Sequence, residues 1–425
     1  VALRDQAAFD NARRWMGWDL LCGHVVPGHD LWNRLADQGF EDRLRAIADE
    51  PCPPHVIGIN HYLTSDRFLD HRLPRYPAHL RGGNGRTAYV DTEAVRVLSP
   101  SPPGLGGAMQ EAWDRYRVPI AVTEVHNGCT REEQMRWTVQ AWRVAQELRQ
   151  RGVSIEAVTS WSLFGSCGWD RLLTSDGRYE PGCFDVSSGK PRATALADVL
   201  RDIACGLEPK HPVLDAAGWW HREIRLHHPV APRPAPLRQY PRARQFAATL
   251  PQPLLITGGT GTLGRAVAAA CRHRAIAHVL TTRADLDLAN QSSIASALDR
   301  YRPWAVINAA GWVRVDDAEC DEVACHAANA HGALRLASAC ASRDIPTIDF
   351  SSDLVFDGAQ DRPYREGDPP GPLNAYGRSK VAAEQAIAGL VGKHLIVRTA
   401  AFFSSTDRHN FAIHAIETLR RGEAF

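Results

Sequence analysis

The sequence lacks any apolar run near the roughly 20 residues that a membrane-spanning helix needs, and no charged-then-apolar leader precedes its first predicted elements. It also lacks a predominant charge, because 49 basic and 48 acidic side chains nearly cancel over 425 residues. Neither half is strongly basic, which argues against nucleic acid and anionic membranes as partners. These absences predict a globular, cytoplasmic protein of two or three domains.

Metal-binding cysteine pairs are missing as well. The ten cysteines form no CxxC pair, and the closest two in sequence, Cys320 and Cys325, have no histidine cluster beside them. We therefore predict no metal site, and unpaired thiols of this kind suit a reducing cytoplasm.

Short apolar strands alternate with helical patterns on both sides of a region rich in Pro, Arg and His. Such alternation predicts an α/β fold with parallel sheets covered by helices. Proline disfavours helix interiors and central strands, so the intervening region reads as an extended linker, although its Gly218-Trp219-Trp220 stretch could dock on a domain. The predicted organisation is a first domain at 1–205, a linker at 206–250 and a second domain at 251–425.

A glycine-rich turn, TGGTGTLG, opens the second domain and places Gly258, Gly261 and Gly264 between a strand and a helix. Glycines at this spacing permit a tight turn and let the backbone approach a pyrophosphate. The phosphates would then lie at the helix N-terminus, where free N–H groups favour negative charge. The context predicts a dinucleotide site, although three glycines could also form a plain turn.

Tyr376 and Lys380 lie four residues apart at a helix start, in AYGRSK. That spacing puts both side chains on one helix face. A phenol titrates near ~10 in water, so it needs a neighbouring positive charge to act as an acid–base catalyst at neutral pH. We expect Lys380 to lower the pKa of Tyr376; taken alone, such a pair is more often surface decoration.

The glycine turn, INAAG, SSDLVFDG and YGRSK follow one another in the order found in extended short-chain dehydrogenase/reductases. From about Leu254 to Glu423 the chain resembles their dTDP-4-dehydrorhamnose reductase branch. The resemblance implies a doubly wound Rossmann sheet and an NAD(P)H-dependent reduction of a keto-sugar nucleotide. It implies Tyr376 as proton donor, Lys380 as its partner and Ser352 as a hydrogen-bonding group on the same oxygen. The implied cofactor residues are Gly258, Gly261, Thr262, Leu263, Gly264, Asn308, Ala309 and Ala310.

The choice of cofactor depends on the second strand end. An acidic residue there would favour NAD(H), whereas Thr282 is followed by Arg283, which could meet a 2′-phosphate. We expect NADP(H) over NAD(H); a solvated surface arginine is the alternative. Two departures from the family, Leu354 in place of an aromatic residue and Ala401 in place of a tryptophan, leave open a non-catalytic NADP-binding regulatory module.

The first domain places Glu124 at the end of the apolar strand PIAVTE. A strand-end carboxylate in a (β/α)8 barrel lies on the catalytic face, where it can attack an anomeric carbon; a structural glutamate is the alternative. Together with VIGINHYLTSDRFLD and AVTSWSLFGSCGWD, this strand resembles barrel strands six to eight of family 1 glycoside hydrolases. The resemblance implies a partial TIM barrel with Glu124 as nucleophile and a sugar pocket formed by Asn60, Tyr62, Trp161 and Trp169.

The barrel pattern is incomplete, because Gly168 replaces a sugar-binding glutamate and no Asn-Glu-Pro motif precedes Asp5. We therefore expect the chain to be an internal piece of a longer fusion whose barrel half does not hydrolyse glycosides by itself. The leading hypothesis is a keto-sugar-nucleotide reductase fused to a glycosidase-like barrel. The alternative is a glycoside hydrolase as the main activity. The partner is a sugar nucleotide or carbohydrate, and the oligomeric state is open.

Overall fold

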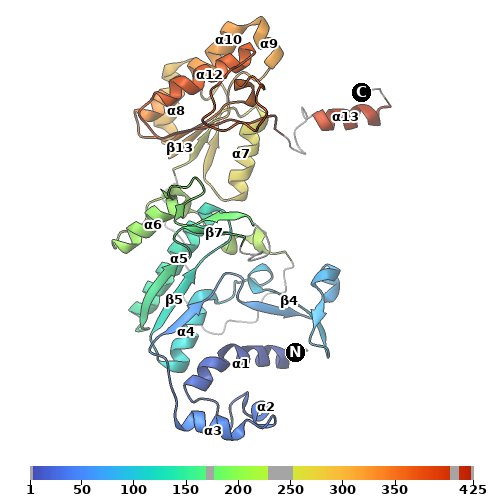
Figure 1. The fold of residues 1–425 in the computed structure, drawn as a ribbon, viewed down its shortest axis with the longest axis vertical. Helices are drawn as coiled ribbons and strands as arrows, with labels where there is room; N and C mark the ends of the chain where they lie inside the picture. The colour runs from blue at the N-terminus through green and yellow to red at the C-terminus, as the bar shows by residue number, and fades with distance from the viewer. Residues whose placement is uncertain (1–2, 169–176, 228–251, 403–410, 423–425) are drawn as a thin grey trace. The chain divides into compact units, whose positions relative to one another are not determined.

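The computed structural model describes residues 3–168, 177–227, 252–402 and 411–422. They belong to two compact units, Val1–Ala247 and Ala248–Phe425 (Figure 1). Trp169 and positions 228–250 of the predicted linker lie outside the described residues. Within the described ranges, no helix has the length and hydropathy that a bilayer crossing requires.

The first unit is built on a parallel sheet of β1 (Ile57–Asn60), β5 (Ile120–Val125) and β6 (Ile155–Ser160), in that spatial order. Helix α4 (Gly104–Tyr116) precedes β5 and α5 (Arg131–Gln150) follows it, and both pack their apolar side chains into one core with the strands. The α/β class with a parallel sheet is therefore confirmed. The sheet has three strands, so a closed barrel is not formed by the described residues.

The remaining elements of the first unit surround this sheet. They are α1 (Arg4–Leu21), α2 (Trp32–Ala36), α3 (Glu41–Asp49), β2 (Arg67–Asp70), β3 (Gly82–Gly83), β4 (Ala88–Glu93), β7 (Gly165–Cys167), β8 (Tyr179–Pro181), β9 (Phe184–Asp185), β10 (Arg192–Ala193) and α6 (Ala195–Ala204). β2, β4 and β3 form one small antiparallel sheet, while β7–β8 and β9–β10 are antiparallel pairs.

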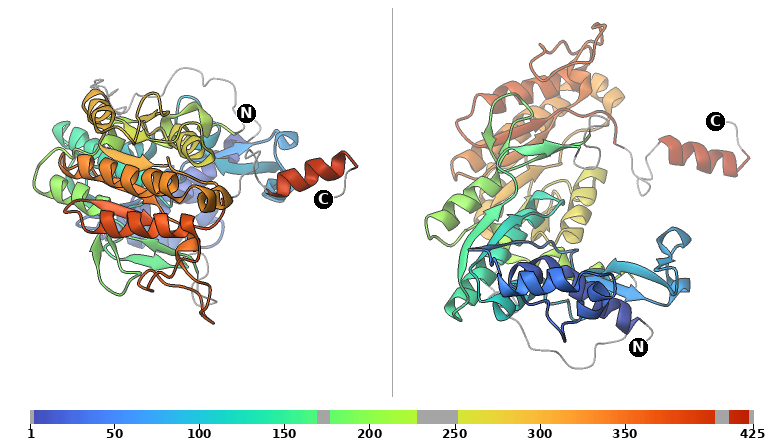
Figure 2. Two further views of the ribbon diagram at one scale, coloured as in Figure 1. Left: turned by 90° about the horizontal axis from the view of Figure 1, so that it is seen from above. Right: turned by 60° about the horizontal axis from the view of Figure 1, so that its bottom comes forward.

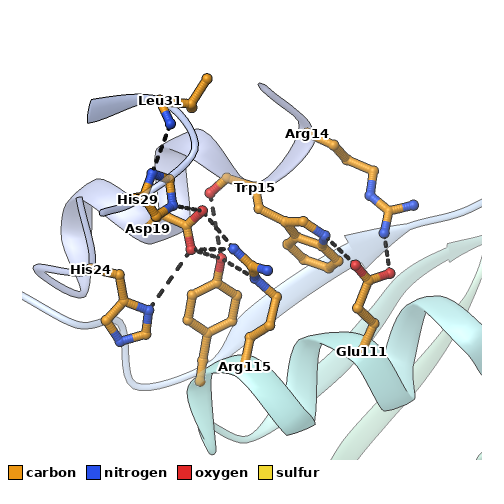
Figure 3. Close-up of polar contacts among 9 residues, drawn as sticks. Arg14, Trp15, Asp19, His24, His29, Leu31, Glu111 and Arg115 are labelled. Carbon is orange, nitrogen blue, oxygen red and sulfur yellow. Dashed lines mark hydrogen bonds and ion pairs between the residues drawn. The ribbon is translucent and has the colours of Figure 1, made fainter. Parts of the chain in front are cut away.

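Helix α1 is fastened to α4 by polar contacts at two points (Figure 3). The fully buried Asp19 carboxylate accepts two hydrogen bonds from Arg115, at 2.7 and 2.8 Å, and one from the Tyr116 hydroxyl at 2.7 Å. One turn or more earlier, Trp15 Nε1 donates to Glu111 at 2.7 Å. Burial opposes the ionisation of Asp19, but hydrogen bonds from Arg115 and Tyr116 outweigh it and lower the pKa of this carboxyl group. The cluster is a structural clamp for the first helix.

The described part of the predicted linker packs against the first unit. Trp220 is 3% exposed and lies edge-on to Trp137 of α5, with ring centroids 5.5 Å apart. The Trp219 N–H donates to Glu133, also on α5, at 3.1 Å. Residues up to 227 thus belong to this unit, because the indole side chains provide the apolar area that a proline-rich segment otherwise lacks.

The second unit is a parallel sheet with the strand order β12–β11–β13–β14–β15. It is doubly wound, with helices on both faces of the sheet (Figures 1 and 2). Its strands are β11 (Leu254–Ile256), β12 (His278–Leu280), β13 (Ala305–Asn308), β14 (Thr347–Phe350) and β15 (His394–Val397). Its helices are α7 (Thr262–His273), α8 (Gln291–Tyr301), α9 (Val315–Cys320), α10 (Glu322–His326), α11 (Ala333–Ala341), α12 (Ala375–Ala388) and α13 (Phe411–Arg420).

Alternate residues of the strands face different helices. Leu254 and Ile256 pack against α7, whereas Leu255 and Val306 pack against α8 and α11 on the opposite face. Because parallel strands pair residues that point the same way, Thr347 and Asp349 of β14 share the α8/α11 face with Val306 and Asn308. This alternation decides which side chains can meet behind the strand ends.

Candidate functional site

The strand order reverses between β11 and β13, so their carboxyl ends form the switch point at which open α/β sheets bind ligands. The glycine turn follows β11 at this point. Gly258 has φ +74°, and a Cβ there would lie 2.3 Å from the carbonyl oxygen of Ala309. A Cβ on Gly264 would lie 2.5 Å from the Gly258 carbonyl oxygen. Both positions therefore require glycine for the close approach of the turn to β13 and α7.

Gly261 differs from these two glycines. It has an ordinary φ of −86°, and the nearest atom to an added Cβ is the Gly258 carbonyl oxygen at 3.3 Å. Gly261 is the N-cap of α7, whose first helical residues are Thr262 and Leu263. The open side of the turn therefore faces the helix N-terminus, where an anion is stabilised by the dipole. The residues present fit a pyrophosphate.

Arg283 follows β12 with its side chain 83% exposed and its Nε 3.5 Å from Asp287. At the end of β13, Ala309 and Ala310 flank the turn, but Asn308 is 5% exposed and points into the protein rather than along the surface.

Tyr376 and Lys380 lie in the first turns of α12, which Asn374 caps by accepting a hydrogen bond from the Gly377 N–H at 2.6 Å. The Lys380 ammonium lies 5.7 Å from the centroid of the Tyr376 ring and donates to the Phe350 carbonyl oxygen at 3.1 Å. Ser352 accepts from the Leu354 N–H at 3.1 Å and donates to Asp353 at 3.0 Å. The structure thus brings all three predicted residues to the carboxyl end of β14.

The pKa of Tyr376 is raised, chiefly by burial and further by the charges of Cys325 and Asp353, against a smaller opposing effect of the Ser352 hydrogen bond. The expected lowering by Lys380 is absent in this arrangement, because that ammonium is directed to the backbone of β14. The phenol is therefore protonated at neutral pH, which is the form that can donate a proton.

A second group of predicted residues meets in the first unit. Asn60 pairs in register with Glu124 at the carboxyl ends of β1 and β5. The Tyr62 hydroxyl donates to Glu124, and Thr123 donates to Asn60. Burial, followed by the Glu124 hydrogen bond, raises the pKa of Tyr62 to about 12. Trp161 follows β6, and its backbone N–H donates to the Val125 carbonyl oxygen at 3.0 Å.

Sequence reasoning overlooked Asp349, a buried carboxylate within β14. Its signal was an aspartate inside TIDF, where an inward-facing apolar residue is the usual choice for a central strand. No group of three or more His, Cys, Asp and Glu side chains within the described ranges is arranged to hold a metal ion.

Residues 252–424 match the family model described as the RmlD substrate binding domain. A dTDP-4-keto-6-deoxy-D-glucose reductase from Streptomyces niveus is 43% identical to this chain over 147 residues. The matched region covers 34% of this chain and 51% of that reductase. A stretch of 152 residues, 36% of this chain, is 36% identical to 50% of a dTDP-4-dehydrorhamnose reductase from Streptomyces griseus.

Among solved structures, a dTDP-4-dehydrorhamnose reductase from Bacillus anthracis in complex with NADP is similar to this chain, with 29% sequence identity and a TM-score of 0.39. The similarity covers 40% of this chain and 60% of that reductase. The chain spans about half the length of the two curated relatives.

Proposed function

We propose that the second unit binds NADP(H) and reduces a carbonyl group of a dTDP-linked keto-sugar. The observation that carries the proposal is the meeting of Tyr376, Lys380 and Ser352 at the carboxyl end of β14, in the same sheet as the glycine turn. The similarity of residues 252–424 to the reductases from Streptomyces supports the substrate class.

Bound NADPH would supply hydride to the carbonyl carbon. Tyr376 would donate its phenolic proton to the carbonyl oxygen, for which its raised pKa keeps the proton in place. Ser352 would hydrogen-bond the same oxygen, turning its hydroxyl away from Asp353, to which it now donates. Lys380 would hold the ribose hydroxyls, and solvent would return a proton to Tyr376.

The test is NADPH oxidation by the full chain with a dTDP-4-keto-6-deoxy sugar. Tyr376→Phe should lower kcat about 10²–10⁴-fold, the usual contribution of a general acid. Tyr301→Phe is the matched control and should keep its activity, because Tyr301 ends α8 just before β13 and therefore lies near the amino ends of the strands, away from the site. Equal turnover by the Tyr376 variant would refute the proton donor, and NADPH binding without reduction of any keto-sugar would favour a regulatory module.

We also propose that the first unit derives from part of a (β/α)8 barrel and presents Glu124 to a sugar. Two observations support this proposal. β1, β5 and β6 are parallel neighbours that lie in the sheet in their order along the chain. Glu124 and Tyr62 are in contact at the carboxyl ends of these strands. A dinitrophenyl 2-deoxy-2-fluoroglycoside carries a leaving group that needs no general acid, so it tests the nucleophile alone.

Mass spectrometry should find the fluoro-sugar on the Glu124 peptide, with no label in Glu124→Gln. Glu156→Gln, which alters an exposed carboxylate on β6, is the control and should be labelled normally. Failure to label the native chain at high reagent concentration would sink this second proposal.

A further inference from the structure

Three neighbouring strands of the second unit place a chain of buried polar side chains on the α8/α11 face. The Thr257 hydroxyl donates to Asn308 Oδ1 at 2.8 Å, and Asn308 Nδ2 donates to Asp349 Oδ1 at 2.8 Å. The Ala310 N–H, in the turn after β13, donates to Thr257 Oγ1 at 3.1 Å. Thr257, Asn308 and Asp349 are 2%, 5% and 6% exposed. The chain ends at Asp349, whose charge needs compensation because burial removes it from water.

Lys380 contributes to that compensation through space, because no hydrogen bond or ion pair within 4 Å joins its ammonium to the Asp349 carboxylate. Its ammonium donates to the carbonyl oxygen of Phe350, the residue after Asp349 on β14. Burial lowers the pKa of Lys380, while the charge of Asp349 raises it. Reciprocally, burial raises the pKa of Asp349 to about 6, against the Asn308 hydrogen bond and the positive charge of Lys380. Each group therefore favours the charged form of the other.

Other titratable groups also act on this carboxylate. His394 on β15 favours its ionised form. On α11, burial raises the pKa of the Cys340 thiol to about 12, and the charge of Asp349 adds to that rise. Cys340 therefore stays a neutral thiol, and of the two basic side chains that act on Asp349, Lys380 has the larger effect and His394 the smaller.

We propose that Asp349 is a positioning residue that acts through space: its buried charge keeps Lys380 an ammonium where Lys380 donates to the Phe350 carbonyl oxygen, while Asn308 and Thr257 fix the carboxylate to the turn after β13. The inference deepens the proposed reductase function and rests on it for its catalytic meaning. With Asp349 ionised, Lys380 remains charged and fixed beside Tyr376. Protonation of Asp349 below about pH 6 removes the negative charge that favours the ammonium form of Lys380.

The decisive measurement does not use catalysis. The chain contains four lysines, Lys190, Lys210, Lys380 and Lys393. Competitive acetylation with acetic anhydride, followed by mass spectrometry, gives the pH midpoint for each lysine in the full chain. In Asp349→Asn, the Lys380 midpoint should fall by about one to three pH units, the usual effect of losing an opposite charge. Lys190 and Lys210, both in the first unit, serve as the internal references.

Asp344→Asn is the matched control, because Asp344 is an exposed aspartate paired with Lys393 at 3.2 Å. It should leave the Lys380 midpoint unchanged. An unchanged Lys380 midpoint in Asp349→Asn would overturn the inference. In a pH profile of kcat/KM, Asp349→Asn should also lose the acidic limb near pH 6 and shift its alkaline limb to lower pH, and retention of the native profile would overturn it too.

A second variant protects the test if Asp349→Asn does not fold. Lys380→Met keeps the apolar stem but leaves the Asp349 carboxylate without its counter-ion. The loss of Tm should be small at pH 5, where Asp349 is mostly protonated, and larger at pH 8; an equal loss at both would contradict the pairing. A shifted Lys380 midpoint in a protein that reduces no keto-sugar would keep the pairing and refute the proposed function.

Discussion

The three glycines of the turn after β11 predict a separation of folding from cofactor binding. Replacing each by alanine adds one methyl group at three positions that differ in space. At Gly258 and Gly264 the new Cβ would collide with backbone oxygen atoms at 2.3 and 2.5 Å, whereas at Gly261 the nearest atom is 3.3 Å away. The Gly261 contact is tight without being a clash, so we expect Gly261→Ala to fold after a local shift of a few tenths of an ångström. It should bind NADPH poorly, because a methyl group there occupies the space that a pyrophosphate would use.

The magnitudes follow from the geometry. Gly258→Ala forces an L-residue into a left-handed conformation, at about 1–2 kcal/mol, and adds overpacking of about 1–3 kcal/mol. The free energy of unfolding should therefore fall by about 2–5 kcal/mol. At Gly261, alanine is a poorer N-cap by about 0.5–1 kcal/mol, but it loses about 0.4–1 kcal/mol less backbone entropy on folding. The net change should stay within about 1 kcal/mol.

Two measurements are made on each variant of the full chain: the Tm of thermal unfolding, and the affinity for NADPH from a fluorescence titration. For a unit of this size, Gly258→Ala should lower Tm by about 4–20 °C, since 1 kcal/mol corresponds to about 2–4 °C. Gly261→Ala should shift Tm by less than about 4 °C and weaken NADPH at least tenfold. Unchanged NADPH affinity in a stable Gly261→Ala protein would refute the placement of the pyrophosphate.

Further predictions concern charged residues. Asp19→Asn should lower the free energy of unfolding of the first unit by about 2 kcal/mol. This is less than the full value of several charge-assisted hydrogen bonds, because the Arg115 side chain is 35% exposed and can be hydrated. Asp10→Asn, on the same helix, is the control and should change the free energy of unfolding by less than about 0.5 kcal/mol. The pKa of Asp19 is lower in the folded protein than its unfolded value of about 3.8. This stabilisation should therefore be present above the unfolded pKa and disappear as pH falls through the folded pKa. A difference in unfolding free energy between the native protein and Asp19→Asn that stays undiminished at the lowest pH would contradict this. Arg283→Ala should weaken NADPH about tenfold and leave NADH unchanged in parallel titrations, and an equal effect on both would show that this arginine does not meet the 2′-phosphate.

The sequence by itself predicted the features that depend on residues close together in the chain. The glycine spacing in 258–264, the four-residue spacing of Tyr376 and Lys380, and the alternation of apolar strands with helices each depend on short segments. The α/β class and the parallel sheets followed from these local periods and are confirmed. The same reasoning placed Glu124 at a strand end, while Tyr62, which contacts it in the structure, was named only by the resemblance to family 1 glycoside hydrolases.

Only the tertiary structure decided how distant residues share charge and space. Asp349 on β14 accepts a hydrogen bond from Asn308 on the neighbouring strand β13, 41 positions earlier in the sequence. The Lys380 ammonium donates to the backbone of β14 instead of pointing toward the hydroxyl of Tyr376. The packing of Trp220 on α5 joined residues up to 227 to the first unit. Burial and electrostatic pairing depend on which segments the chain brings together, and residue spacing along the sequence carries no record of that.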